Sequence, residues 1–248
     1  MISRRGMLAL AAACLLPRRT LAAGLAPLEA MPFSSLAPGG PLPPWLERFT
    51  FGARVAPTRF DLVEDGGRTV LRARADAAAS GLARALRVDL RERPLLAWRW
   101  KVTRLVEKGN LARREGDDYA ARLYVTFDLD PATLGAAERI KLALARAVWG
   151  ERLPLAALCY VWDAHAPAGT FAPNAYTDRV WMVVADSGAA ALGRWVGHLR
   201  DVAGDYRRAF GAEPPAVNAV IVSADTDNTR ERAESYFADV EFRPRPPS

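Results

Sequence analysis

The feature that most constrains the fold is an alternation of apolar and polar residues at two places in the chain. Positions 96, 98, 100 and 102 are apolar and alternate with residues such as Arg99 and Lys101. From 121 to 129 the odd positions are apolar, while the even positions from Arg122 to Asp128 carry polar groups. Because a period of two places successive side chains on opposite faces of a strand, each segment predicts a strand with one buried face.

The rest of the chain adds further strands, and two stretches depart from the alternation. Residues 130–150 and 190–210 instead have helical features: Asp130 can cap a helix that ends before Gly150, and Trp195 and Tyr206 fall at helical spacing in the second stretch. At least eight strands with few helices predict a mainly β fold, an antiparallel β-sandwich or jelly roll with two inserted helices. Further strands are expected at 69–75, 82–90, 157–163, 179–185, 217–224 and 236–242.

The first 23 residues have the three parts of a cleavable signal peptide. Arg4 and Arg5 precede a short apolar run over residues 7–16, and residues 21–23 have the small side chains of a cleavage site. The context of the two arginines is typical of twin-arginine export, with ordinary secretion as the alternative. We therefore expect a periplasmic or secreted bacterial protein with no stable membrane anchor after cleavage.

Composition suggests one domain in the remaining chain. Residues 24–44 are rich in proline and glycine and are expected to run as an extended lead-in, 45–243 as a single β-sandwich domain and 244–248 as a tail. The 34 basic residues include four arginines of the signal peptide, and without them 30 basic residues face 28 acidic ones. With no basic run in the mature chain, binding to nucleic acid is not expected.

Six motifs stand out along the chain: Ser80-Gly81-Leu82, residues 94–102, residues 116–124, residues 173–177, Asp205-Tyr206 with Phe210-Gly211, and residues 225–229. Together they resemble a bacterial family known as domain of unknown function 3047, over about residues 45–243. The resemblance implies an exported bacterial domain with a lectin-like or carbohydrate-binding-module-like sandwich, and it supplies no catalytic residues to carry over.

Familiar catalytic motifs are absent from the sequence. It has no G-x-S-x-G elbow, no Walker loop and no G-x-G-x-x-G turn after a strand. His165 and His198 are the only histidines, and no His or Cys cluster has metal-ligand spacing. Cys159 is the only cysteine after the signal peptide, and we expect it to be a packing residue within a buried strand. Thiol and transition-metal chemistry are therefore not expected.

Polar residues around the strand at 121–129 are the first candidate site. Asp117 and Asp118 precede this strand, and Asp118, Arg122 and Tyr124 share the parity of its polar face. That face predicts a groove in which Asp118 accepts hydroxyls and Arg122 binds a carboxylate. The alternative is an Asp to Arg brace on a solvated sheet face.

The loop that follows the strand at 217–224 is the second candidate. Asp225, Asp227, Asn228 and Thr229 place many oxygens in one loop, which suits calcium, with Asp225 and Asp227 as tentative ligands. The loop lacks the glycine and glutamate of an EF-hand, and Asp and Asn also stabilise ordinary turns. A structural turn or ligand-binding loop is therefore the alternative.

Aromatic residues and two further polar positions complete the candidates. Trp162 and Tyr176 are predicted to stack on a sugar, as are Trp45, Trp181 and Tyr119, although most aromatics of such a domain lie in its core. Asn174 and Asp205 are expected to join Asp118, Arg122, Tyr176 and the 225–229 loop in one functional surface.

Two classes of function follow from these residues. The first is a noncatalytic periplasmic module that binds a glycan or another small polar ligand of the envelope. The alternative is a glycan-cleaving enzyme, because that chemistry requires only two suitably separated carboxyl groups and leaves no linear motif. Its carboxylates would come from Asp117, Asp118, Asp205, Asp225 and Asp227. A structural envelope protein is a second alternative.

Overall fold

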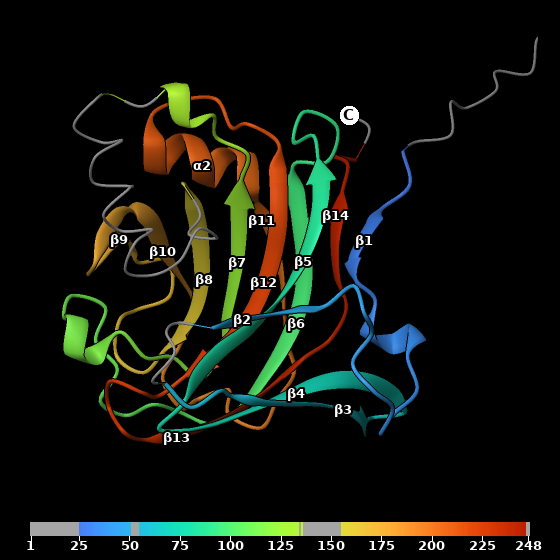
Figure 1. The fold of residues 1–248 in the computed structure, drawn as a ribbon, viewed down its shortest axis with the longest axis vertical. Helices are drawn as coiled ribbons and strands as arrows, with labels where there is room; N and C mark the ends of the chain where they lie inside the picture. The colour runs from blue at the N-terminus through green and yellow to red at the C-terminus, as the bar shows by residue number, and fades with distance from the viewer. Residues whose placement is uncertain (1–24, 51–54, 134, 136–154, 247–248) are drawn as a thin grey trace, which may run out of the picture.

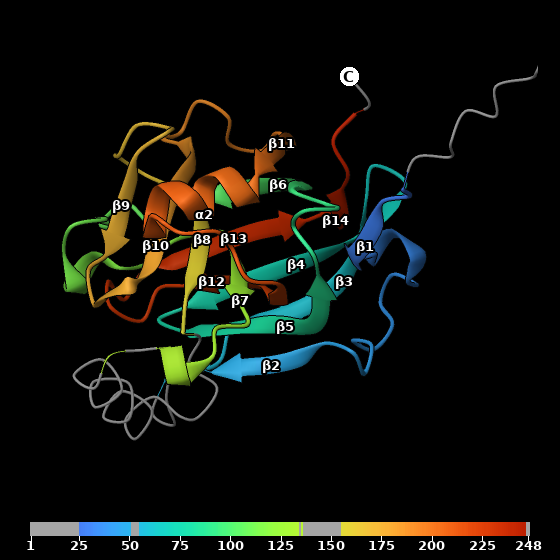
Figure 2. The same ribbon diagram turned by 90° about the horizontal axis from the view of Figure 1, so that it is seen from above.

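Two curled, mainly antiparallel sheets form a sandwich, seen as two layers in Figure 2. The computed structural model describes residues 25–50, 55–133, 135 and 155–246. Within these residues all strand pairs are antiparallel except β8 (Ala157–Asp163) with β10 (Thr177–Ser187), which are parallel. The predicted fold class, a mainly β antiparallel sandwich, is confirmed, and no α-helix among the described residues is long and apolar enough to cross a membrane.

Sheet A forms one layer and sheet B the other (Figure 1). Sheet A contains, in spatial order, β1 (Leu28–Met31), β14 (Val240–Arg243), β6 (Leu95–Arg104), β13 (Arg232–Phe237), β4 (Arg68–Asp76) and β3 (Arg59–Asp65), and β11 (Val196–Asp201) pairs with β6. Sheet B contains β2 (Glu47–Thr50), β5 (Ala79–Val88), β12 (Val217–Asp225), β7 (Arg122–Phe127), β8 (Ala157–Asp163), β10 (Thr177–Ser187) and β9 (Phe171–Asn174).

The core lies between the sheets and follows the alternation of β6. Leu96, Trp98, Trp100 and Val102 are buried there, while Arg99 is exposed on the outer face. Trp100 lies 5.4 Å from Trp98, centroid to centroid, in an edge-on arrangement that suits aromatic pairs. The predicted half-buried strand is therefore correct for β6.

Strand β7 differs from the prediction, because both of its faces are buried. Val125 and its odd-numbered neighbours enter the main core, whereas Tyr124 lies on the opposite face in a second apolar cluster with Cys159, Met182 and Ile221. The side of β7 that was expected to line a groove is thus covered by protein.

The stretch 190–210 was wrongly predicted as one helix. Residues 196–201 form β11, which pairs with β6, and only α2 (Val202–Phe210) is helical. Asp201 caps α2 by accepting a hydrogen bond from Gly204 N, and Gly211 ends it with a left-handed backbone. Pairing with β6 therefore overrides the helical spacing and places His198 on a strand. Of the other predicted helix, Pro131–Thr133 form a 3-10 turn (η3), and residues 134 and 136–154 lie outside the described residues.

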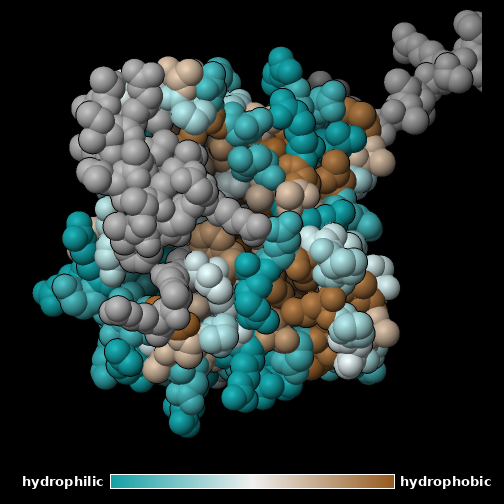
Figure 3. Space-filling view, viewed as in Figure 1, coloured by the Kyte–Doolittle hydropathy of each residue, from teal (hydrophilic) through white to brown (hydrophobic). Residues whose placement is uncertain are grey.

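Several boundaries also differ. The segment expected as a lead-in contributes β1, the 3-10 turn η1 (Phe33–Ser35) and buried Ala30, Met31 and Phe33 to the sandwich. Apolar residues gather at the surface on the side where β1 lies (Figure 3). The single strand expected over 236–242 is divided into β13 and β14, and β1, β2, β3 and β9 were not predicted.

Candidate functional site

The first candidate site is built around Arg122, the first residue of β7. Strand β12 runs antiparallel beside β7, which brings Asp225 at its end next to the start of β7. Arg122 donates from Nε to Asp225 Oδ1 at 2.9 Å, and its Nη2 lies 2.8 Å from Oδ2. Arg122 and Asp225 are only 2% and 4% exposed. The result is a buried bidentate Arg–Asp pair, in which two roughly parallel hydrogen bonds fix the geometry.

The terminal nitrogens of the Arg122 guanidinium also contact neighbouring protein groups. Arg122 Nη1 donates to the Tyr124 hydroxyl at 2.9 Å, and Nη2 donates to the Asp117 carbonyl and lies 3.3 Å from Asp117 Oδ1. The guanidinium carbon lies 4.4 Å from the centre of the Tyr119 ring, whose backbone N donates to Asp225 Oδ1 at 3.0 Å. The carboxylate and guanidinium are thus bonded within the protein.

Asp118 ties the 225–229 loop to this pair. Its carboxylate accepts from Thr229 N at 2.6 Å, from Asn228 N at 3.4 Å and from Asn228 Nδ2 at 3.3 Å. On the other side, Asn174 Nδ2 donates to Asp117 Oδ2 at 3.0 Å, and Asn174 Oδ1 accepts from Tyr176 N at 2.9 Å. Loops that are distant in sequence therefore meet at one end of sheet B.

We call this group the Arg122 cluster. It contains nine of the residues predicted as a site: Asp117, Asp118, Arg122, Tyr124, Asn174, Tyr176, Asp225, Asn228 and Thr229. Tyr176 lies at its exposed rim, 42% exposed, with its hydroxyl donating to Arg114 O at 3.1 Å. Asp118, Arg122, Asn174, Tyr176 and the 225–229 loop therefore lie together, but Asp205 does not join them, and Arg122 and Asp118 are buried rather than facing the expected groove.

Burial dominates the electrostatics of the cluster. It raises the pKa of the Asp225 carboxyl to about 8, against the opposing effect of Arg122. It also raises the pKa of Asp227, with Asp118 as the next cause, and raises the pKa of the nearby Cys159 thiol to about 12. These shifts follow from desolvation of charge in a covered site.

The cluster does not favour calcium. Both carboxylate oxygens of Asp225 face Arg122, and Oδ1 also accepts from Tyr119 N. A dication at Asp225 would lie beside a buried guanidinium and would compete with these bonds. Within the part of the chain that the structure describes, no group of three or more His, Cys, Asp or Glu is arranged to hold a metal ion.

Asp205 and Trp162 lie apart from the cluster. Asp205 on α2 accepts from Arg200 Nη2 at 2.7 Å and from the Tyr160 hydroxyl at 2.9 Å, so it braces α2 against the sandwich. Trp162 is 1% exposed and donates from Nε1 to Gly188 O at 3.0 Å, which makes it a core residue. Asp205 therefore does not join the functional surface expected around Arg122, and buried Trp162 has no exposed ring face to stack on a sugar.

Most of the other aromatic candidates are also covered. Tyr119 is buried, Trp181 packs beside Phe171 with 5.2 Å between ring centroids, and Trp45 lies under Arg84 at 4.6 Å. Among the aromatic candidates, only Tyr176 is an exposed residue.

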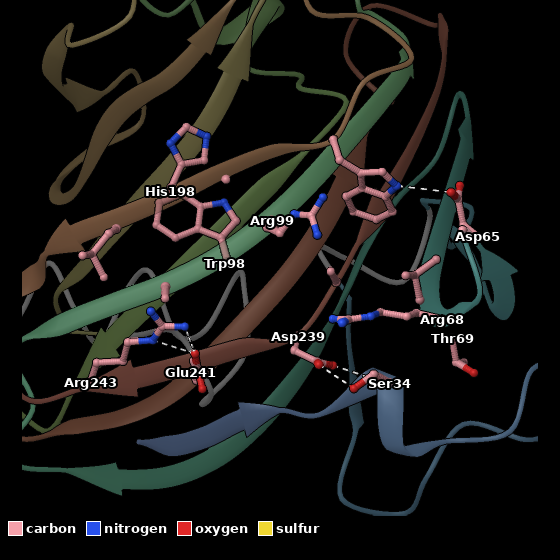
Figure 4. A pocket seen from close by; sticks show the side chains of 17 residues that line it. Ser34, Asp65, Arg68, Thr69, Trp98, Arg99, His198, Asp239, Glu241 and Arg243 are labelled. Carbon is pink, nitrogen blue, oxygen red and sulfur yellow. Dashed lines mark hydrogen bonds and ion pairs between the residues drawn. The ribbon is translucent and has the colours of Figure 1, made fainter. Parts of the chain in front are cut away.

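The sequence prediction missed an open pocket of about 790 Å³ on the outer face of sheet A. We call it the sheet A groove (Figure 4), and its principal lining residues are Asp65, Arg68, Arg99, Trp195, Leu199 and Glu241. Asp65 ends β3 and Arg68 begins β4, Arg99 and Glu241 lie on β6 and β14, Leu199 lies within β11, and Trp195 directly precedes β11. Leu199 is 56% exposed and gives the groove an apolar surface.

Trp195 is the tryptophan of the groove that remains partly exposed, because Trp98 is buried. Its half-buried indole donates from Nε1 to Asp65 Oδ1 at 3.2 Å. Lys101 Nζ lies 5.3 Å and the Arg99 guanidinium carbon 5.6 Å from the ring centre. The ion pair with Lys101, followed by the hydrogen bond from Trp195, lowers the pKa of Asp65 against the effect of its burial.

One sequence signal pointed to this groove. The parity that buries Trp98 and Trp100 turns Arg99 and Lys101 outward, but the assignment of Trp195 to a helix removed it from the same surface. The other residues of the groove reach it only through strand pairing.

Comparison with known proteins gives a family and no activity. A family model described as "Protein of unknown function (DUF3047)" matches residues 43–241. No curated protein matches the chain. The match covers most of the sandwich, including the Arg122 cluster and nearly all of the sheet A groove. The chain therefore belongs to the DUF3047 family of proteins.

Proposed function

We propose that this protein binds a saccharide or another polar ligand of the bacterial envelope without cleaving it, and that the ligand lies in the sheet A groove. The observation that carries the proposal is an open pocket of about 790 Å³ that presents the Trp195 indole among charged and hydroxyl side chains. An aromatic ring provides a flat apolar surface for a sugar ring, and the surrounding polar groups can bond to its hydroxyls.

The state of the carboxylates supports binding rather than hydrolysis. In the groove, Asp65 is paired with Lys101, Glu241 with Arg243, and Asp239 accepts from Ser34 N at 2.8 Å. Hydrolysis by paired carboxyls requires one acid that gives a proton and one that attacks or activates water. Carboxylates already held by protein donors are poorly placed for either role.

The Arg122 cluster has a structural role in this proposal. Its ion pair and the bonds of Asp118 join the start of β7, the end of β12 and the 225–229 loop. We infer that it fixes this end of sheet B, while the ligand occupies the other sheet. Periplasmic or secreted location is part of the proposal and rests on the signal-peptide pattern of residues 1–23.

A glycan array with the protein from residue 24 onward tests the proposal. We expect specific binding that Trp195→Ala weakens at least tenfold in calorimetry, a loss of about 1.4 kcal/mol. Trp45→Ala is the matched control, because Trp45 is also a half-buried tryptophan but lies outside the groove. Circular dichroism and thermal melting show whether each variant is folded.

Chromatography of each bound saccharide after prolonged incubation distinguishes binding from cleavage. Intact saccharide supports the noncatalytic proposal, and shortened products support the enzyme alternative. Absence of any array signal, or binding that survives Trp195→Ala, would contradict the assignment to the groove.

A further inference from the structure

In the sheet A groove the acidic side chains are bonded to other protein groups, whereas two exposed arginines form no ion pair among the described residues. Its three lining acids all have protein partners: Asp65 is held by Lys101 and Trp195, Glu241 by Arg243, and Asp239 by the backbone N and hydroxyl of Ser34 at 2.8 and 2.5 Å. Two of these acids are neutralised by a cation. Only Asp239 is left with neutral donors alone.

Arg68 and Arg99 are the two cations that remain. Both are exposed, and neither has a carboxylate within ion-pair distance among the described residues. Arg68 begins β4 and Arg99 lies on the outer face of β6, yet both guanidinium groups point toward the middle of the pocket (Figure 4). Once the acids that are paired with Lys101 and Arg243 are set aside, the groove retains the two positive charges of these arginines and the one negative charge of Asp239.

We infer that the groove selects saccharides that carry carboxylate groups, with Arg68 and Arg99 binding the acid. This inference rests on the proposed function and specifies its ligand class. A guanidinium presents two parallel N–H donors that match a carboxylate, which a neutral sugar cannot satisfy equally well. Trp195 and exposed Leu199 supply apolar surface in the same pocket. A uronic acid ring combines the two features, because it has an apolar face and a carboxylate on one edge.

The experiment compares ligands that differ only in charge. Short oligomers of galacturonate, mannuronate and glucuronate are titrated by calorimetry, each beside its methyl ester, in which the same rings carry no charge. We expect at least one acid to bind about tenfold more tightly than its ester at low salt. Because these arginines are exposed, added salt should reduce the difference.

Arg68→Gln combined with Arg99→Gln is the decisive variant. We expect it to bind the acid no more tightly than the ester. Arg87→Gln is the control, because Arg87 is an exposed arginine outside the groove and pairs with Asp128 at 2.8 Å. This control should keep the preference for the acid. Both altered positions are exposed, so folding is expected to persist and is checked by thermal melting.

The possible failures are separable. Equal binding of acid and ester, lost on Trp195→Ala, would overturn the charge selection and leave the proposed function standing. The same holds if neutral glycans bind on the array and no uronate does. A preference for acid that survives the double variant would also refute the role of Arg68 and Arg99. Absence of all saccharide binding would overturn both proposals.

Discussion

Replacement of Arg122 by methionine is expected to lower the free energy of unfolding by about 3–5 kcal/mol at about pH 9, where the carboxyl of Asp225 is ionised. The substitution keeps much of the apolar volume but removes the ion pairs with Asp225 and Asp117 and the hydrogen bond to Tyr124. Breaking a buried pair by removing one partner costs this amount, because the carboxylate left behind must either stay charged without its partner or take up a proton. For a domain of this size the loss corresponds to a fall in melting temperature of about 10 °C.

Urea unfolding followed by tryptophan fluorescence measures the loss. The matched control is Arg232→Met, which removes a strand arginine paired with Asp76 at 3.0 Å, where both side chains are about two-thirds exposed (64% and 66%). An exposed pair of this kind contributes under about 1 kcal/mol. If the two variants lose the same small amount, the cluster is solvated and the assignment of a structural role is wrong. If Arg122→Met does not fold, Arg122→Lys supplies an intermediate case.

The deficit of Arg122→Met should also depend on pH. Burial raises the pKa of Asp225 to about 8, so a rise in pH through this value ionises the carboxyl beside Arg122 in the wild type. Without the guanidinium this pKa rises further, and the folded variant retains the proton that the folded wild type releases. Since the folded variant then binds more protons, its stability falls relative to the wild type as the pH rises. We expect a larger deficit at about pH 9 than at about pH 6, and an equal deficit would refute this reasoning.

Four further outcomes are expected. Cys159, whose thiol is buried with its pKa raised to about 12, should react with a thiol reagent only after the mature protein is unfolded, and rapid native labelling would contradict its burial. Gly81→Ala should lower the melting temperature, since a Cβ there would lie 3.0 Å from a carbonyl oxygen of the neighbouring strand; an unchanged value would refute the clash. Millimolar calcium should not raise the melting temperature, and an increase that a chelator reverses would show that the 225–229 loop binds it. Replacing Arg4 and Arg5 by lysine should hold the precursor in the cytoplasm, whereas normal export would exclude the twin-arginine route.

Features that depend on neighbouring residues could be predicted from the sequence. The alternation over 96–102 determined both the strand and its buried face, because the two-residue period is a local property of extended backbone. The apolar run at residues 157–163 was also predicted as a strand, with the bounds that the structure has. The family resemblance was also available from the motifs alone, and the family match confirms it.

Local spacing failed where a distant partner decided the outcome. Residues 196–201 have the spacing of a helix, but their backbone groups bond to β6, about 100 residues earlier in the chain. A local sequence pattern cannot show which distant strand will pair with a segment. The parity of β7 correctly placed Arg122 opposite the main core, yet it could not show that Tyr119, Met182 and their neighbours bury that face as well.

The two candidate sites show the same contrast between local sequence and long-range pairing. Sequence reasoning brought Arg122 and Asp225 together from polar residues at strand ends, and the pairing of β7 with β12 makes their contact possible. Their burial depends on the layer that covers them. In sheet A, the order β4, β13, β6 and β11 brings Arg68, Arg99 and Trp195 to one groove. The sequence alone thus determined which residues could form strands, whereas the tertiary structure decided which surfaces remain open, because hydrogen bonding between distant strands sets which side chains become neighbours.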